Sequence, residues 1–143
     1  MLRLSSMLLA LGTLFSAATN VGAQCVPIPG TGCPGATPLI CLGPPRIGQV
    51  AQVSYAGNGL VVAQLSLDGP VWPLPLPLAC APGCFLAGTP LVYTMGFGAT
   101  QLLFMVPNDP LFVGFTYIGQ GYMVPAGQNC VTASNAIRGT VVP

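Results

Sequence analysis

Glycine and proline recur too densely along this chain for any helix of useful length, and no other feature constrains its fold as strongly. The 143-residue sequence contains 19 glycines and 16 prolines, and both residue types interrupt helices. Short apolar runs bounded by turn residues lie between them, which is the pattern of all-β proteins. We therefore predict a single antiparallel β-sandwich of the immunoglobulin-like type, with seven or eight short strands.

The clearest strand signals flank Asn58-Gly59, the kind of dipeptide most typical of a tight hairpin turn. Ile47–Tyr55 precedes this pair and Leu60–Leu67 follows it, and both segments alternate apolar and polar side chains. A period of two places the apolar residues of each segment on one face. The pattern therefore predicts a half-buried hairpin over residues 47–67.

Further strands are predicted along the rest of the chain. Thr100–Val106 is apolar on both faces, so we expect it at the centre of a sheet and covered on both sides. Pro107–Pro110 follows as a turn. The remaining predicted strands are Phe85–Leu86, with a continuation over Leu91–Met95, then Leu111–Ile118 and Ala136–Val142.

Residues 73–78 alternate proline and leucine, although proline is unfavourable in a sheet. In an antiparallel strand, alternate residues direct their N–H groups to the same edge, so the three prolines would leave one edge without donors. The leucines would keep their donors for a partner strand and would face the core. We predict an edge strand blocked on its outer side. A polyproline II segment lying across the sheet edge is the alternative.

The N-terminus is predicted to be a secretory signal peptide over residues 1–23, with a short helix. Arg3 precedes the apolar run Met7–Phe15, and Val21–Ala23 supplies small residues for cleavage after Ala23. The run is too short for a membrane span, so an uncleaved anchor is the less favoured alternative. We expect one disulfide-rich domain over residues 24–143, secreted or in the cell envelope, without a stable membrane span.

Six cysteines accompany this signal, and an even number in an exported chain predicts three disulfides. We expect two local pairs and one long pair that joins the two ends of the domain. The chain has no histidine and no Cys-x-x-Cys motif, so no metal site is expected. The expected pairs are Cys25–Cys33, Cys80–Cys84 and Cys41–Cys130.

The chain is almost without charge, and this excludes several classes of partner. It contains three Lys or Arg residues, two Asp or Glu residues and no histidine. No basic patch is available for nucleic acid, so we expect no nucleic-acid partner. A neutral surface also lacks the repulsion that keeps soluble proteins apart. The charged residues after the predicted cleavage are Arg46, Asp68, Asp109 and Arg138.

We predict that the protein is not an enzyme. General acid–base catalysis usually needs a histidine or a pair of tuned carboxylates, whereas Asp68 and Asp109 both occupy ordinary turn positions. A serine or cysteine nucleophile would lack a base, and no phosphate-binding glycine motif precedes a helix. We therefore expect no catalytic residue, no cofactor and no bound metal.

Two non-catalytic functions fit this composition. The first is a structural or interaction module at the cell surface, with a second copy or another envelope protein as its partner. The second is a carbohydrate-binding module with an aromatic platform, although core or half-buried strand packing is the favoured interpretation of each aromatic residue. An outer-membrane barrel is less favoured because a polar lumen is missing. The candidate ligand-facing aromatics are Tyr55, Trp72, Tyr93, Tyr117 and Tyr122.

Several motifs are similar to those of a group of short uncharacterised secreted bacterial β-sandwich domains. They are PLPLPL followed by CAPGC, the stretch VPNDPLFVGFTYIGQGY, and SNAIRGTV near the C-terminus. The resemblance covers roughly Cys33 to Val142 and rests on turn and strand signatures. It implies a β-sandwich module, sometimes appended to larger exported proteins, and it carries over no catalytic residue.

Overall fold

The computed structural model describes residues 25–43 and 45–143, so the predicted signal peptide, residues 1–23, lies outside the described residues. The described chain contains nine strands, one 3₁₀ turn, η1 (Pro110–Phe112), and no α-helix. The all-β prediction is confirmed. The strands are β1 (Val26–Pro27), β2 (Ile40–Leu42), β3 (Val50–Leu67), β4 (Val71–Pro73), β5 (Phe85–Ala87), β6 (Pro90–Met105), β7 (Thr116–Pro125), β8 (Thr132–Ala133) and β9 (Ile137–Thr140).

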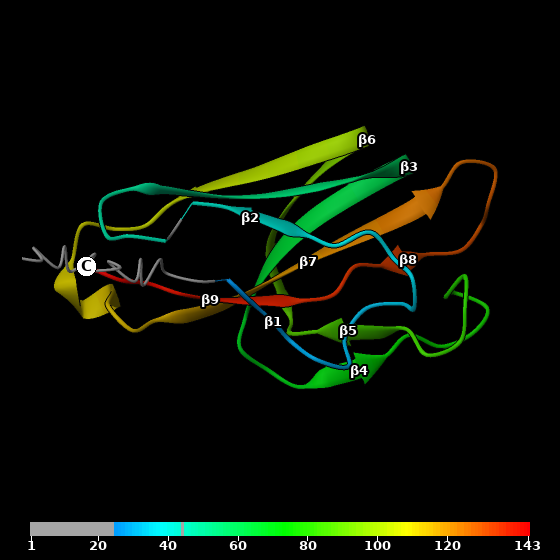
Figure 1. The fold of residues 1–143 in the computed structure, drawn as a ribbon, viewed down its shortest axis with the longest axis horizontal. Helices are drawn as coiled ribbons and strands as arrows, with labels where there is room; N and C mark the ends of the chain where they lie inside the picture. The colour runs from blue at the N-terminus through cyan, green and yellow to red at the C-terminus, as the bar shows by residue number, and fades with distance from the viewer. Residues whose placement is uncertain (1–24, 44) are drawn as a thin grey trace, which may run out of the picture.

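Seven of the strands form one antiparallel sheet (Figure 1). The order is β1-β9-β7-β3-β2, with β6 also paired to β3 and β8 paired to β7. The first half of β3 pairs with β2 and its second half with β7, whereas β6 runs beside both halves. β4 and β5 form a separate two-stranded sheet. The antiparallel class is therefore confirmed, while the immunoglobulin-like sandwich arrangement stays a prediction.

The hairpin predicted over residues 47–67 does not form. β3 continues through Asn58-Gly59 as a single strand of 18 residues. Its ladder with β6 shifts register there, so that residues 57–59 fall opposite Gly98 alone. Gly59 has a positive φ, and a Cβ at this position would collide with the Val124 carbonyl oxygen. The Asn-Gly signal therefore marks a bulge, in which extra residues bend a strand without reversing it.

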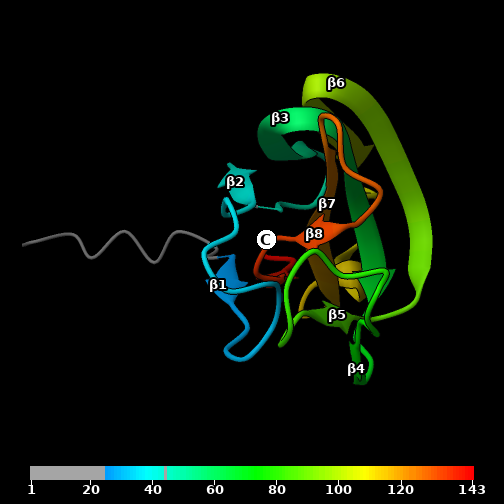
Figure 2. The same cartoon turned by 90° about the vertical axis from the view of Figure 1, so that its right-hand side faces the viewer.

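Because β3 curves, its two halves contribute to one core (Figure 2). Val53 and Tyr55 from the first half belong to the same buried cluster as Val61 and Leu65 from the second half. Tyr117 of β7 completes the centre of this cluster. β6 follows the same curve along the outer side of β3 (Figure 2). The strand predicted over Thr100–Val106 therefore lies at a sheet edge, and its central placement was wrong.

All six cysteines form disulfides, but every predicted pairing was wrong. The chain around β5 lies against two distant segments, since Phe85 exchanges backbone hydrogen bonds with Gly32, and the Cys80 N–H donates to the Val131 carbonyl oxygen at 3.0 Å. Cysteines that are close in sequence therefore meet distant partners. Three disulfides fit an oxidising compartment. The observed pairs are Cys25–Cys41, Cys33–Cys84 and Cys80–Cys130.

The proline–leucine segment is mostly a turn, so the predicted edge strand over residues 73–78 was wrong. β4 ends at Pro73, and the Leu74 N–H donates to the Cys84 carbonyl oxygen at 2.8 Å. The Leu74 N–H therefore bonds a neighbouring segment, as we predicted for the leucines between the prolines. The chain then turns, with the Ala79 N–H donating to the Pro75 carbonyl oxygen at 3.1 Å. Leu76 is exposed and does not reach the core.

The predicted strand Leu111–Ile118 begins later than expected. Pro110–Phe112 forms the 3₁₀ turn η1, and the Asp109 carboxylate caps it by accepting from the Leu111 N–H at 2.9 Å. β7 starts at Thr116. A short polar side chain before a proline satisfies the first free donor of such a turn, and Asp109 does so at the end of the turn predicted over Pro107–Pro110.

Candidate functional site

β6 carries a row of apolar side chains that point away from the core. Alternate residues of a strand share a face, and on β6 the inward face includes the buried residues Thr100 and Leu102. The outward face is exposed, with Phe97 86% accessible to solvent. Monomeric proteins rarely expose contiguous apolar patches of this kind. We call the large exposed residues the β6 face: Leu91, Tyr93, Met95, Phe97, Leu103 and Met105.

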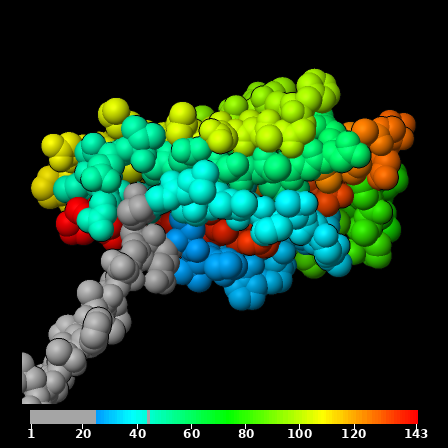
Figure 3. Space-filling model, turned by 45° about the horizontal axis from the view of Figure 1, so that its top comes forward, coloured from blue at the N-terminus to red at the C-terminus, as the bar shows by residue number. Residues whose placement is uncertain are grey.

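The outer edge of β6 also carries unpaired backbone groups. β3 is its only strand partner in the described chain, and alternate residues direct their N–H and C=O groups toward the free edge. In the space-filling view, the yellow-green atoms of β6 form an outer ridge along the molecule (Figure 3). After Pro90 the strand contains no proline and no charged residue. It therefore lacks two of the devices that usually prevent two sheet edges from pairing, namely a charged residue and an internal proline.

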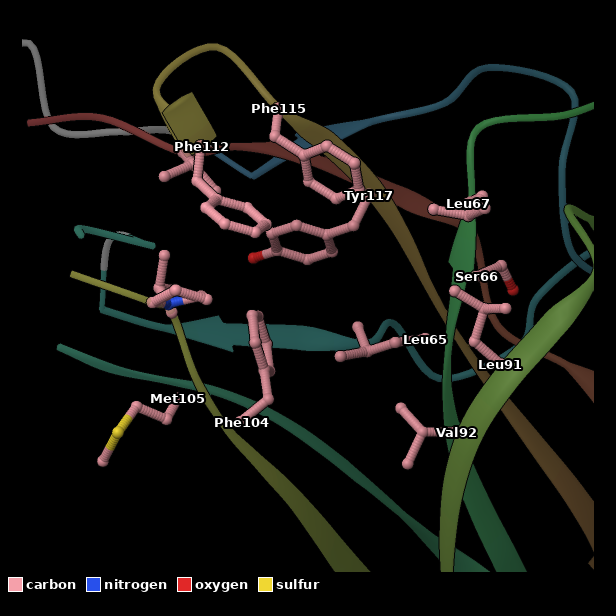
Figure 4. A pocket seen from close by; sticks show the side chains of 13 residues that line it. Leu65, Ser66, Leu67, Leu91, Val92, Phe104, Met105, Phe112, Phe115 and Tyr117 are labelled. Atoms are coloured by element: carbon pink, nitrogen blue, oxygen red, sulfur yellow. The ribbon is translucent and has the colours of Figure 1, made fainter. Parts of the chain in front are cut away.

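A second apolar feature is a cleft of about 200 Å³ close to the two ends of β6. Leu91 and Val92 line one side, while Phe104, Phe112 and Tyr117 line the other (Figure 4). We call this feature the apolar cleft. Its other lining residues are Leu65, Ser66, Leu67, Met105, Val106, Pro107, Phe115 and Val141.

The aromatic wall of the apolar cleft is packed edge to face. The rings of Phe104 and Tyr117 have centroids 5.0 Å apart, and those of Phe112 and Phe115 are 6.1 Å apart. Such pairs hold their rings in place more firmly than area burial alone. Burial raises the pKa of Tyr117 to about 12, so its hydroxyl is neutral at physiological pH. The wall is therefore packed ring against ring and uncharged.

A buried polar network lies where β7 pairs with β3, along the edge of β3 opposite to β6. Residues 70–88, which we call the arm, cover β7 there. The Gln120 side chain accepts from the Ala87 N–H at 2.8 Å and donates to the Phe85 and Ser134 carbonyl oxygens, both at 2.9 Å. Tyr122 donates to Gln120 at 3.0 Å and accepts from Gln64. Burial raises the pKa of Tyr122, and the hydrogen bond from Gln64 lowers it.

This network holds the arm in place and is not a reactive site. It contains two amides, one neutral phenol and backbone groups, none of which transfers protons readily near neutral pH. Buried amides without partners would be costly. Here Gln120 ties the arm to β7 through Ala87 and Phe85 and also bonds Ser134, which follows β8. The network therefore fixes the arm over one part of the sheet.

The five aromatics proposed for a platform are not brought together. Tyr55 and Tyr117 are buried in the core, and the Tyr55 hydroxyl has no hydrogen-bond partner within the described residues. Trp72 and Tyr93 are exposed but lie on different sheets, on β4 and β6. Tyr122 belongs to the polar network. Carbohydrate binding therefore stays a prediction, without a shared aromatic surface to support it.

Sequence reasoning missed the β6 face, apart from Tyr93. The signal was present in the odd-numbered residues from Leu91 to Met105, which are apolar or uncharged throughout. Over Thr100–Val106 the even-numbered residues are also largely apolar, so the pattern there indicated a strand covered on both sides. Only the pairing of β3 shows that β6 has a free edge.

The charged residues of the described chain do not assemble a reactive centre. Asp68 pairs with Arg138 at 3.0 Å, with both side chains nearly half exposed. Asp109 caps η1. Within residues 25–43 and 45–143 no group of three or more His, Cys, Asp or Glu side chains could hold a metal ion. The same residues include no helix that is long and apolar enough to cross a membrane.

Comparisons with protein-family models, with curated proteins and with solved structures found no match to this chain. The β6 face, the free edge of β6 and the apolar cleft are the features of the described chain that bear on its function. The resemblance to secreted bacterial β-sandwich domains stays a prediction.

Proposed function

We propose that this protein is an exported, non-catalytic module that associates with further copies of itself through β6. The observation that carries the proposal is a 16-residue edge strand without a charged residue or an internal proline, and with an exposed apolar face. Addition of a strand to an exposed edge is a recurrent mode of recognition, in which backbone hydrogen bonds supply much of the affinity.

A second copy is the partner that best fits this edge. Antiparallel pairing of two identical strands is self-complementary about a twofold axis, the commonest symmetry of protein dimers. If Phe97 faces Phe97 of a second copy, Leu91 of one copy lies opposite Leu103 of the other, on the same face of the joined sheet. An axis normal to the sheet at Phe97 also preserves the curvature of both strands, so the curved sheet continues across the junction.

Charge favours the same partner. Identical surfaces usually repel each other when they carry net charge, but the described chain has two Arg and two Asp residues, and none of them lies on β6. The pairing therefore has no electrostatic cost. It removes apolar side chains from water, which is the dominant favourable contribution to most protein association.

The proposal is tested by sedimentation of the exported form of the protein with a matched pair of charged variants. Tyr93→Lys/Met95→Lys places two charges on the β6 face, at positions 60% and 57% exposed. Leu76→Lys/Leu78→Lys adds the same charge at positions 62% and 55% exposed in the arm. We expect the wild type and the arm variant to form dimers or larger assemblies, and the β6 variant to be monomeric.

Two outcomes would contradict the proposal. A wild-type protein that stays monomeric at high concentration would remove self-association altogether. Equal dissociation by both charged variants would show that net charge, and not the edge of β6, controls the association. Electron microscopy of the wild type distinguishes closed dimers from extended assemblies.

A further inference from the structure

We infer that the apolar cleft binds the hydrocarbon tail of an uncharged, unbranched molecule, with the head group left in solvent. This inference does not rest on the self-association of β6, although the two surfaces share Leu91 and Met105 at the opening of the cleft. The lining also includes Val92 of β6 and the aromatic wall behind it, which do not belong to the β6 face.

The lining determines the chemical class of the ligand. Nearly every lining side chain is aliphatic or aromatic, and none of the four charged residues of the described chain lines the cleft. The Ser66 hydroxyl accepts a hydrogen bond from Gln64 at 3.4 Å, and the Tyr117 hydroxyl is neutral. A charged group would lose its hydration without compensation here. The ligand portion inside the cleft is therefore hydrocarbon.

The size of the cleft determines how much hydrocarbon enters. An apolar cavity of about 150 Å³ accommodates one benzene ring, and the cleft measures about 200 Å³. A single ring would leave part of this space unfilled, whereas a flexible chain fills it and leaves through the opening. Leu91 and Met105 are exposed at the opening, so they can cover the part of the chain that emerges.

The closed aromatic wall makes the cleft a defined site. Phe104 and Tyr117 belong to, or pack against, the main core cluster, so the floor of the cleft is continuous with the core of the protein. A ligand tail that enters the cleft therefore extends the packing of the core. Binding should reach a limit once the tail has filled the available volume.

The test is a series of 1-alkanols from butanol to decanol, titrated into the full protein and followed by calorimetry. Each methylene that enters the cleft should strengthen binding about fourfold, and the increase should stop when the cleft is full. An affinity that continues to rise through decanol without a limit would indicate nonspecific partitioning and would overturn the inference. Absence of saturable binding by any member of the series would do the same.

A matched pair of variants locates the site. Val92→Phe fills the cleft at a position 46% exposed, and Val71→Phe makes the same change on β4 at a position 42% exposed. Val92→Phe should weaken octanol binding by more than about tenfold, because it removes the space of two or more methylenes. Val71→Phe should leave it unchanged. Equal effects of the two substitutions would overturn the inference.

Methyl NMR of the wild type tests the same point without any substitution. Octanol should shift the resonances of Leu65 and Val92 and leave those of Val71 in place. Titration of the Tyr93→Lys/Met95→Lys variant should give the wild-type affinity, since neither residue lines the cleft. If alkanols instead dissociate assemblies without shifting Leu65, the cleft is a contact between copies and the inference is wrong.

Discussion

One row of side chains crosses β7, β3 and β6. It runs from the part of the sheet that the arm covers to the part that is exposed to solvent. Gln64 of β3 lies opposite Gln120 of β7 on one side and opposite Tyr93 of β6 on the other. Gln120 is fully buried under the arm, Gln64 is almost buried and Tyr93 is exposed. The same face of the sheet is therefore polar where it is covered and apolar where it is open.

This change from polar to apolar side chains distinguishes the part of the sheet under the arm from the part formed by β6. The covered part places amides under the arm because hydrogen bonds specify how the arm sits, and two disulfides, Cys33–Cys84 and Cys80–Cys130, hold it there. The exposed part leaves apolar side chains of β6 in contact with water, and this exposure does not stabilise a single copy of the protein. The self-association that we propose would cover these residues, and the predictions below are designed to separate the two regions.

The largest effect is expected from the disulfide that ties the arm to the loop before β8. Cys80→Ser/Cys130→Ser opens a link with a sequence separation of 50 residues, which should lower the free energy of unfolding by about 4 kcal/mol. Denaturant unfolding measures this loss. Cys25→Ser/Cys41→Ser, with a separation of 16 residues, should lose about 3 kcal/mol. A larger loss for the shorter link would contradict the chain-entropy explanation.

A glutamine exchange compares the two parts of the sheet directly. Gln120→Leu should lower the free energy of unfolding by about 3 kcal/mol, because the Ala87 N–H and the Phe85 and Ser134 carbonyl oxygens lose their partner. Gln101→Leu, the same change on the exposed side of β6, should alter it by less than about 0.5 kcal/mol. Thermal unfolding of both variants gives the comparison. Similar losses would show that the arm does not depend on the network.

Alkaline pH should destabilise the core. The folded protein holds the Tyr117 proton up to about pH 12, whereas an ordinary tyrosine releases it near pH 10.0. Stability is therefore fully present below pH 10.0 and falls as the pH rises toward 12, by up to about 3 kcal/mol from this residue. Unfolding measured across this range should become less pH-dependent in Tyr117→Phe. An unchanged pH dependence in that variant would show that ionisation of Tyr117 does not control the loss of stability. Tyr93→Phe makes the matched substitution on β6 and serves as the control.

The smallest change in stability is expected on the β6 face. Leu103→Ser should alter the free energy of unfolding by less than about 0.5 kcal/mol, because the side chain is exposed. The same variant should weaken self-association by about tenfold or more, because a leucine no longer leaves water on pairing. Leu76→Ser, equally exposed in the arm, should change neither quantity. Concentration-dependent sedimentation decides between the two positions.

The fold class and several local features follow from the amino-acid sequence alone. Frequent glycine and proline exclude long helices, so the chain had to form strands. The capped turn at Asp109 and the participation of all six cysteines in disulfides depend on local chemistry and on their even number. These properties need no knowledge of which strands become neighbours.

The other features could not be predicted from the sequence, because they depend on contacts between residues that are far apart in the chain. Asn58-Gly59 is compatible with a hairpin or with a bulge, and the strand that pairs on both sides of it, β6, selects the bulge. The cysteine pairs follow from where the arm docks. The apolar stretch Thr100–Val106 suits a central strand as well as an edge. Among the described strands β6 pairs with β3 alone, which makes it an edge. Thr100, Leu102 and Val106 are buried, whereas Leu103 and Met105 on the other face are exposed.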